Sequence, residues 1–225
     1  MDLKIIYEDN HTIVVEKPAN IPVQEDASKD KDLFTIIKEY IKVTYNKPGN
    51  VYLGLVHRLD RPTAGLIVFA KTSKAASRLS NALRLHQVER KYLAVVHGKL
   101  EGTGKLVDYM VKNNKTNTSR VIHKNYPDAK KAVLTYEVLD TVDNFSLVSV
   151  ELETGRSHQI RVQFQNLGHP LFGDQRYGQD VNKVGDQLAL YASELNYKHP
   201  TQDKMIETLE MPPSVYPWNL FNLEK

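Results

Sequence analysis

The run LIVFA at residues 66–70 constrains the fold of this chain more than any other segment. It is short, continuous and rich in β-branched and aromatic side chains, so it predicts a central strand. Residues 73–86 then place apolar side chains at helical spacing, and residues 90–97 form a second strand with apolar groups on both faces. Because such strands must be covered on both sides, the pattern predicts a layered protein with a buried sheet.

The other segments add strands and isolated helices without a steady βαβ alternation. Residues 4–16 predict two strands around a turn at Glu8-Asp9-Asn10, and residues 33–41 an amphipathic helix. Further strands are expected at residues 133–139, 145–152, 188–197 and 205–210. Ser157 is expected to cap a helix that buries Ile160, Phe164 and Leu167 along one side. We therefore expect an α+β fold and, since no linker is visible, a single domain over residues 1–225.

The composition is that of an ordinary globular protein. The residue types and motifs that are missing exclude several kinds of site. There are no cysteines among the 225 residues, which excludes disulfides, thiolate zinc sites and cysteine nucleophiles. No apolar run reaches the ~20 residues that cross a bilayer, and no signal peptide is visible, so the cytoplasm is the expected location. A glycine-rich phosphate loop and a serine nucleophile elbow are also missing. The net charge of +3 does not by itself indicate a nucleic-acid binder.

The sequence HRLD, which begins at His57, places two charged side chains just before the apolar run. An extended backbone would direct Arg58 and Asp60 to the same side. A carboxylate at the mouth of a rigid strand is typical of a catalytic position. An aspartate close to Arg61-Pro62 also commonly opens a turn. These residues alone leave both interpretations open.

A second group of polar residues lies between Glu153 and Asp174. On a helix, His158, Arg161 and Gln165 would share one face. An arginine near a helix start is not favoured by the helix dipole, so a carboxylate elsewhere should hold it, and Asp60 is the expected partner.

Other candidate residues have an ordinary structural explanation beside the functional one. Tyr92 could stack on a base, although core packing is the commoner role of a strand tyrosine. His57, His158 and His169 lack the spacing of a metal site and are expected to be structural, with no metal bound.

The strongest local excess of positive charge lies in residues 112–131. Only Asp128 opposes its cationic and histidine side chains, which are Lys112, Lys115, Arg120, His123, Lys124, Lys130 and Lys131. Such a segment could follow a phosphate backbone, but charge runs are more often solvated surface.

Taken together, four runs resemble the RluA-type pseudouridine synthase family. They are YEDNHTIVVEKPANIPVQ, GLVHRLDRPTAGLIVFAKT with RKYLAVVHG, TGRSHQIRVQFQNLGHPLFGDQRYG, and LALYASELNYKHP, in the family's order. The resemblance implies the pseudouridine synthase fold, with a mixed, mainly antiparallel central sheet, a few flanking helices and an active-site cleft. It also implies isomerisation of a uridine within ribosomal or transfer RNA, without a cofactor, by a monomer. On this resemblance we expect the chain to start directly in the catalytic domain, without the N-terminal RNA-binding module that some relatives carry.

The resemblance also assigns roles to residues. It implies that Asp60 is the essential catalytic carboxylate, that Arg161 keeps it ionised and that Tyr92 stacks on the flipped uracil. Arg58 would enter the space that the base leaves, with His57 beside it in the substrate-binding motif, and Ile160 would form the floor behind the base. Ala64 departs from the serine of many relatives.

Two other functions remain to be tested against this one. A catalytically silent RNA-binding or ribosome-assembly protein could use the same fold. A glycoside hydrolase would need a second carboxylate facing Asp60, for which Glu153 and Asp174 are the nearby candidates.

Overall fold

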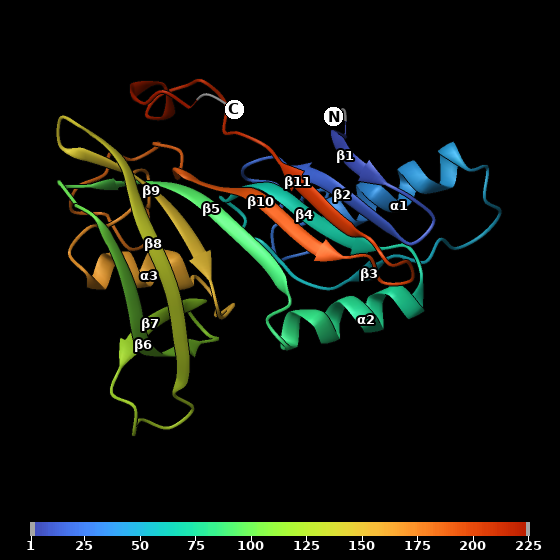
Figure 1. The fold of residues 1–225 in the computed structure, drawn as a ribbon, viewed down its shortest axis with the longest axis horizontal. Coiled ribbons are helices and arrows are strands. Elements are labelled where there is room, and N and C mark those ends of the chain that lie inside the picture. The colour runs from blue at the N-terminus through green and yellow to red at the C-terminus, as the bar shows by residue number, and fades with distance from the viewer. Residues whose placement is uncertain (1–2, 224–225) are drawn as a thin grey trace. The chain divides into compact units, whose positions relative to one another are not determined.

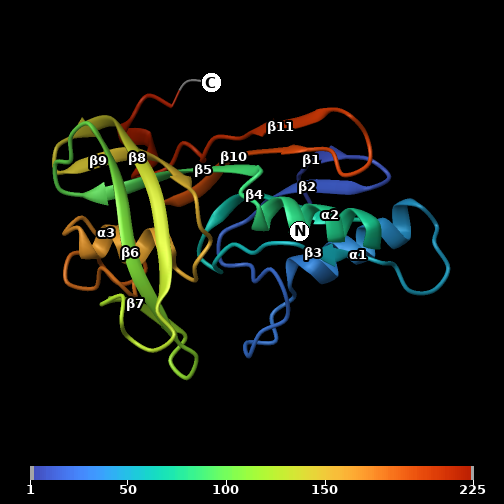
Figure 2. The same cartoon turned by 60° about the horizontal axis from the view of Figure 1, so that its bottom comes forward.

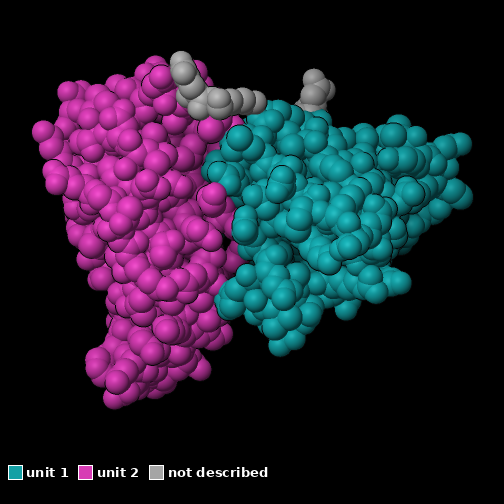
Figure 3. Space-filling model, viewed as in Figure 1, with its two compact units in different colours: residues 1–89, 192–210 teal, residues 90–191, 211–225 magenta. Residues whose placement is uncertain are grey.

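The computed structural model describes residues 3–223, and the chain divides into two compact units (Figure 3). Unit 1 consists of residues 1–89 and 192–210, and unit 2 of residues 90–191 and 211–225. Each unit therefore combines two separate stretches of the chain.

Unit 1 is built on a sheet in which β1, β2, β4 and β10 are neighbours in that order (Figure 1). β11 lies beside β10, and β3 lies beside β4. The pairs β1–β2, β2–β4, β3–β4 and β10–β11 are antiparallel. The bounds are β1 Ile5–Glu8, β2 Thr12–Lys17, α1 Leu33–Thr44, β3 Gly54–Leu55, β4 Ala64–Ala70, α2 Ser73–Arg84, β10 Leu190–Lys198 and β11 Met205–Leu209.

Both faces of the unit 1 sheet are covered by a helix. Val68 of β4 shares a core with Leu79 of α2, whereas the ring of Phe69 lies 6.3 Å from the ring of Phe34 in α1. Because successive strand residues point to opposite faces, the two helices cover opposite sides (Figure 2). This double cover explains why the strand sequence is continuously apolar rather than alternating.

Gly65 allows β4 to lie unusually close to β10. Its φ is +110°, and a Cβ atom at this position would lie 2.3 Å from the carbonyl oxygen of Ala192. Only glycine combines that backbone conformation with so close an approach. The residue stands five positions after Asp60, so the close approach fixes the start of the strand that follows the HRLD sequence.

Unit 2 is built on antiparallel strands in the order β5-β9-β8-β6-β7 (Figures 1 and 2). Val162 of α3 packs in a small core with Met110 of β6 and Ala132 of β8. The bounds are β5 Val88–His97, β6 Thr103–Asn113, β7 Thr118–Ile122, β8 Lys130–Val142, β9 Phe145–Leu152 and α3 Gln159–Asn166, with a short 3₁₀ helix at Trp218–Leu220. β5 begins in the last two residues of the first stretch of unit 1, and β10 begins in the last two residues of the first stretch of unit 2.

The expected α+β fold with a mixed, mainly antiparallel sheet is confirmed. The expected strands appear as β1, β2, β4, β5, β8, β9, β10 and β11, and two of the expected helices as α1 and α2. The expected start of the third helix is wrong. α3 begins at Gln159, and its N-cap is His158 in the left-handed conformation, with no hydrogen bond from a capping side chain.

The third helix also lacks the expected one-sided apolar stripe. Every residue from 159 to 164 is buried, including the polar Gln159, Arg161 and Gln163. Their side chains have internal partners, since Gln159 donates to the carbonyl of Val133 and Gln163 donates to Asp108. Paired polar groups can be buried at low cost, and periodicity does not reveal them.

Candidate active site

The residues expected to carry the chemistry are divided between the two units. His57, Arg58 and Asp60 belong to unit 1, and Tyr92, Ile160 and Arg161 to unit 2.

Asp60 begins a turn between β3 and β4. Its carbonyl oxygen accepts a hydrogen bond of 3.0 Å from the backbone N–H of Thr63, so the aspartate does open a turn before Pro62. The neighbouring Leu59 is buried, whereas Arg58 is exposed and Asp60 is half-buried. The turn therefore presents two charged side chains at the surface of unit 1 around a buried anchor.

Lys17, at the end of β2, holds this turn from inside. Its side chain is fully buried, and its Nζ donates to the carbonyl oxygens of Pro18, Ile21 and Arg61 at 2.9, 2.8 and 2.9 Å. One ammonium group thus ties the loop that follows β2 to the turn of Asp60. Because an ammonium has three N–H donors, these three acceptors use all of them.

Lys17 also interacts electrostatically with the catalytic candidate. Burial lowers the pKa of Lys17 to about 7, the charge of Asp60 acts to raise it, and the charge of Arg61 acts to lower it. The opposite charges of Lys17 and Asp60 therefore attract each other.

Arg61 connects the same turn to the loop before α1. Its guanidinium donates to Asp26 at 3.3 Å and to Ser28 at 2.8 Å, and it also pairs with Asp30. These groups are exposed, so their ion pairs contribute little to stability.

His57 has a structural contact within unit 1. Its Nε2 accepts a hydrogen bond of 3.2 Å from the backbone N–H of Val68 in β4. This contact explains why a histidine stands at the start of HRLD, since it attaches the loop to the strand. Its expected role in substrate binding stays a prediction.

Tyr92 and Ile160 are both largely buried within unit 2. Tyr92 lies on β5 opposite Val150 of β9 and is 6% exposed. Ile160 lies in the first turn of α3 and is 4% exposed. Their expected contacts with the uracil ring also stay predictions.

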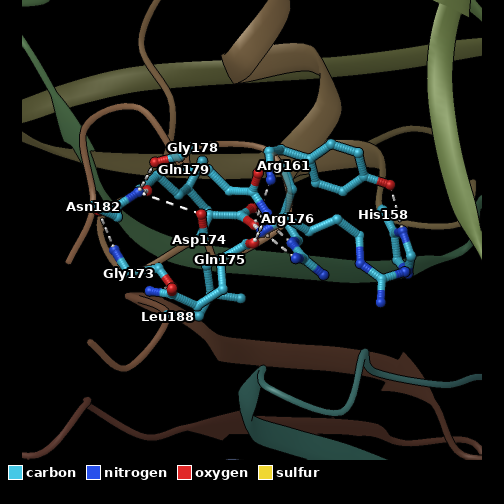
Figure 4. A network of polar contacts seen from close by, with 12 residues as sticks. His158, Arg161, Gly173, Asp174, Gln175, Arg176, Gly178, Gln179, Asn182 and Leu188 are labelled. Carbon is cyan, nitrogen blue, oxygen red and sulfur yellow. Dashed lines mark hydrogen bonds and ion pairs between the residues drawn. The ribbon is translucent and has the colours of Figure 1, made fainter. Parts of the chain in front are cut away.

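Arg161 is held by Asp174 through two parallel hydrogen bonds (Figure 4). Its Nε and one terminal nitrogen each donate at 2.8 Å to a different carboxylate oxygen. The backbone N–H groups of Arg176 and Tyr177 donate to the same carboxylate at 2.9 and 3.0 Å. The sequence indicated that a carboxylate should hold this arginine, and in unit 2 that carboxylate is Asp174. The expected pairing of Arg161 with Asp60 stays a prediction.

Tyr177 extends this arrangement toward β7. The guanidinium carbon of Arg161 lies 5.1 Å from the centre of its ring, which is a favourable cation–π distance. The Tyr177 hydroxyl is 2.7 Å from Nδ1 of His158 and accepts a hydrogen bond of 2.8 Å from the backbone N–H of Ser119. The start of α3, the Asp174 loop and β7 are thus connected by polar contacts.

The second carboxylate that a glycoside hydrolase needs is not supplied by the nearby candidates. Burial acts to raise the pKa of Asp174, but the hydrogen bonds and charge of Arg161 and two backbone N–H groups bring the net pKa below its usual value. A general acid needs a raised pKa instead. Glu153 is exposed and pairs with Lys105. Neither residue has the environment that this rival function requires.

Three residues of these arrangements were not anticipated as functional from the sequence. Lys17 stands at the end of an apolar strand directly before Pro18, where a lysine has no obvious solvent-facing role, and this was the available signal. Asp174 was considered only as a hydrolase acid, and Tyr177 lies in the run that ends QRYG but was given no role.

Among residues 3–223, no cluster of histidine, cysteine, aspartate or glutamate side chains has the arrangement of a metal site. In the same part of the chain, no helix has the length and apolar character needed to span a membrane.

Comparison with known proteins identifies the family. The profile described as RNA pseudouridylate synthase matches residues 11–166, which is more than half of the chain. The chain belongs to the RNA pseudouridylate synthase family. Its membership confirms the resemblance that the four sequence runs indicated.

Curated relatives match over nearly the whole chain. Ribosomal large subunit pseudouridine synthase D of Haemophilus ducreyi is 32% identical over 219 residues, which cover 91% of this chain and 66% of the relative. The same-named protein of Zymomonas mobilis is 33% identical over 223 residues, covering 93% and 69%. The uncharacterized RNA pseudouridine synthase YjbO of Bacillus subtilis is 38% identical over 216 residues, covering 90% and 70%. The chain thus spans about two thirds of the length of these relatives.

Solved structures support the same fold. Human RNA Pseudouridylate Synthase Domain Containing 4 superposes with a TM-score of 0.79 at 22% identity, covering 96% of this chain and 91% of the human chain. Human RNA Pseudouridylate Synthase Domain Containing 1 gives 0.73 at 24% identity, covering 95% and 85%.

Proposed function

We propose that this protein converts specific uridines in structured RNA to pseudouridine, with residues 1–225 acting as one catalytic domain. The observation that carries the proposal is the turn of Asp60, which the buried Lys17 ties to the loop that follows β2, in a chain of this family. A carboxylate on a turn that is fixed in this way has the restricted geometry that catalysis requires.

The reaction needs one bond to break and one to form. The glycosidic bond between N1 of uracil and the sugar breaks, C5 of uracil bonds to the same sugar carbon, the C5 proton leaves to solvent, and N1 gains a proton. Oxidation states balance without an external reagent, so no cofactor is required. Asp60, kept ionised, is proposed to be the group that the reaction cannot proceed without.

The other residues are proposed to prepare the uridine for Asp60. Extruding a base from a stack costs a few kcal/mol, and a side chain that fills the gap lowers that cost. Arg58 is exposed next to Asp60, which supports this role. Tyr92 is proposed to stack on the extruded uracil, with Ile160 behind it and His57 beside the substrate.

Arg161 is proposed to contribute a fixed positive charge that keeps Asp60 ionised. Its bidentate contact with Asp174 and the ring of Tyr177 restrict the orientation of the guanidinium. A guanidinium with restricted orientation loses less entropy when it makes a further contact.

The proposed substrate is ribosomal RNA of the large subunit, with transfer RNA as the second RNA to test. Two relatives carry the name ribosomal large subunit pseudouridine synthase, which supports this order. We further propose that the protein acts as a monomer in the cytoplasm.

The test is tritium release from RNA that is labelled at C5 of uracil and isolated from cells that lack this gene. Wild-type protein should release tritium, and Asp60→Asn should reduce the rate by at least about 10⁴-fold, because it removes the charge that the chemistry needs. Asp128→Asn, which makes the same substitution at an exposed position, is the matched control and should retain the wild-type rate.

Substantial release by Asp60→Asn would overturn the catalytic role of Asp60. If the wild-type protein released no tritium from any RNA but still bound RNA, the silent RNA-binding function would replace the enzymatic one. Separating ribosomal from transfer RNA before the assay identifies the substrate class.

A further inference from the structure

Arg90, near the start of β5, is a cation that the fold leaves without an acceptor. Its Nε is buried, and among residues 3–223 no acceptor lies within hydrogen-bond distance of that atom and no carboxylate forms an ion pair with the side chain. The adjacent Glu89 instead accepts a hydrogen bond from the side chain of Asn196. A guanidinium is always charged and has five N–H donors, so a buried donor that meets no acceptor is unfavourable for folding. Such a group requires an explanation outside the folding of the chain.

The side chain of Arg90 points to the same face of β5 as that of Tyr92. The strand is regular at this point, since Lys91 and Tyr92 are opposite Glu151 and Val150 of β9. Successive side chains of a strand alternate between its faces, and each residue advances the strand by about 3.4 Å. Arg90 therefore lies on the face of Tyr92, about 7 Å along the strand from the residue that is proposed to stack on the uracil.

Gly155 leaves room for the guanidinium of Arg90 beside the segment that leads to α3. A Cβ atom at position 155 would lie 3.1 Å from Nη1 of Arg90, 3.8 Å from Nη2 and 3.9 Å from Cζ. Gly155 is exposed, so the outer nitrogens of the guanidinium lie against the backbone of a surface residue. α3 begins four residues later and carries Ile160, which is proposed to lie behind the uracil. A larger residue at position 155 would crowd the guanidinium.

An unpaired guanidinium on this face suits a phosphate group. The planar fork of an arginine matches two oxygens of a phosphate, and the hydrogen bonds are strengthened by the opposite charges. A nucleotide whose base stacks on Tyr92 brings its own phosphodiester group with it, at a distance from the base comparable with two residues of a strand. The uracil ring offers only neutral carbonyl oxygens, which would leave the charge of Arg90 without a counterion.

We propose that Arg90 binds the phosphodiester group that adjoins the extruded uridine, and that its hydrogen bonds are completed only when RNA is bound. The inference rests on the proposed function for the identity of the nucleotide and for the position of its base on Tyr92. The phosphodiester group takes no part in the bonds that break and form. Arg90 therefore contributes to substrate binding equally before and during the reaction.

The first experiment compares stability and RNA binding in Arg90→Met. Methionine keeps an unbranched side chain but removes the unsatisfied donor, so the thermal unfolding midpoint should equal or exceed that of the wild type. Binding of a fluorescent twelve-nucleotide oligouridylate, measured by anisotropy, should weaken about tenfold or more, because a charge-assisted hydrogen bond is lost. Arg84→Met changes the same residue type at an exposed position of α2 and should match the wild type in both measurements.

A lower unfolding midpoint together with RNA binding equal to that of Arg84→Met would overturn the proposal, because Arg90 would then support the fold and not the substrate.

Rates of tritium release separate binding from chemistry. KM of Arg90→Met should rise about tenfold while kcat stays within about threefold of wild type, as expected when an interaction is equally strong in the ground state and the transition state. The slope of log kcat/KM against log salt should be shallower by about 0.7, the value for one phosphate contact of a single strand. Arg90→Lys keeps the charge but not the fork, so it should keep the wild-type slope and show a raised KM.

An unchanged KM in Arg90→Met, with kcat reduced as strongly as in Asp60→Asn, would contradict a role in binding and overturn the proposal.

A neutral RNA backbone tests the phosphate contact itself. A second twelve-nucleotide probe carries methylphosphonate groups in place of phosphates, so its linkages are uncharged. Arg84→Met should prefer the charged probe by the same factor as wild type, whereas the preference of Arg90→Met should be about tenfold smaller. An equal preference in Arg90→Met and wild type would place Arg90 on another part of the nucleotide, such as a uracil carbonyl, and would overturn the proposal.

The outcomes also distinguish this inference from the catalytic proposal. If wild type releases no tritium but Arg90→Met loses preference for the charged probe, the role of Arg90 holds and the isomerase proposal fails. If tritium release depends on Asp60 while Arg90→Met behaves like Arg84→Met, the role of Arg90 fails and the isomerase proposal holds.

Discussion

Lys17 is the residue on which the geometry of Asp60 depends most directly within unit 1. A fully buried ammonium is costly unless every donor is used, and here three carbonyl oxygens accept from it. The same carbonyls would be left without a donor if the lysine were removed. The side chain therefore stabilises both itself and the loop segments that surround the turn.

Replacing Lys17 with methionine should lower the free energy of unfolding by about 3 kcal/mol or more, because buried carbonyl acceptors lose their partners. Urea unfolding at neutral pH measures this loss. Lys42→Met is the control, since Lys42 is an exposed residue in the last turn of α1 and should change stability by less than about 0.5 kcal/mol.

The activity of Lys17→Met shows whether Lys17 positions the turn of Asp60 or only stabilises the fold. At a temperature where the variant is folded, its rate of tritium release should still fall at least about tenfold, because Asp60 is less well positioned. A variant as stable and as active as the Lys42→Met control would contradict the role assigned to Lys17.

At the scale of elements, the entry to β4 is set by how closely two strands approach. Gly65→Ala should lower the free energy of unfolding by at least about 2 kcal/mol, because a Cβ atom would lie 2.3 Å from the backbone oxygen of Ala192 at a φ of +110°. Thermal or urea unfolding measures the change.

Gly49→Ala provides the matched control for this prediction. Gly49 also has a positive φ, of +81°, but no atom lies within 4 Å of the added Cβ. Gly49→Ala should therefore lose only the free energy of unfolding that backbone strain costs, on the order of 1 kcal/mol. Equal losses in both variants would show that backbone conformation, and not the close approach to β10, governs Gly65.

The elements that the sequence predicted well are those whose burial follows their local period. β4 and residues 92–96 of β5 are continuously apolar, and α1 and α2 carry regular apolar stripes and have N-caps at Asp32 and Thr72. α3 could not be predicted in the same way. Its buried faces include Gln159, Arg161 and Gln163, whose partners come from distant segments.

In the candidate site, too, the residues that could be predicted are those whose relevant neighbours are close in sequence. The motif HRLD identified Asp60 because the relevant residues are adjacent in sequence. The partners of Lys17 and Arg161 depend on loops that are brought together by the fold, so their contacts have no sequence period. Asp174 lies 13 residues after Arg161, and only the loop geometry makes it a bidentate partner.

For the whole molecule, folding stability should depend on buried carboxylates in both units. Asp9 in unit 1 accepts hydrogen bonds from Tyr7, from the backbone N–H groups of His11 and Thr12, and contacts His199 at 2.7 Å. Burial acts to raise the pKa of Asp9, but these hydrogen bonds outweigh it and the net pKa lies well below its usual value. The net pKa of Asp174 in unit 2 is also below its usual value.

The sign of the pH dependence follows from these lowered values. An ionised carboxylate with a lower pKa in the folded state contributes stability above its unfolded pKa of about 4, and loses it as pH falls through the folded pKa. The urea midpoint should therefore decrease from about pH 5 downward. Asp9→Asn and Asp174→Asn should be less stable at pH 7 and should lose less stability on acidification than wild type.

Acid sensitivity that is unchanged in both variants would contradict this assignment. Asp143→Asn, at an exposed turn position, is the control and should follow the wild-type curve.

Unit 1 combines two stretches that are far apart in the chain, and this affects how it can form during synthesis by the ribosome. β4 emerges early, but its neighbour β10 and the following β11 are supplied by residues 192–210. After β4, more than a hundred further residues, including most of unit 2, must therefore be synthesised before β10 can pair with it. During that interval β3 can pair only with Phe69 and Ala70 of β4, so the rest of this strand edge is open, which is a site for mispairing with another nascent chain.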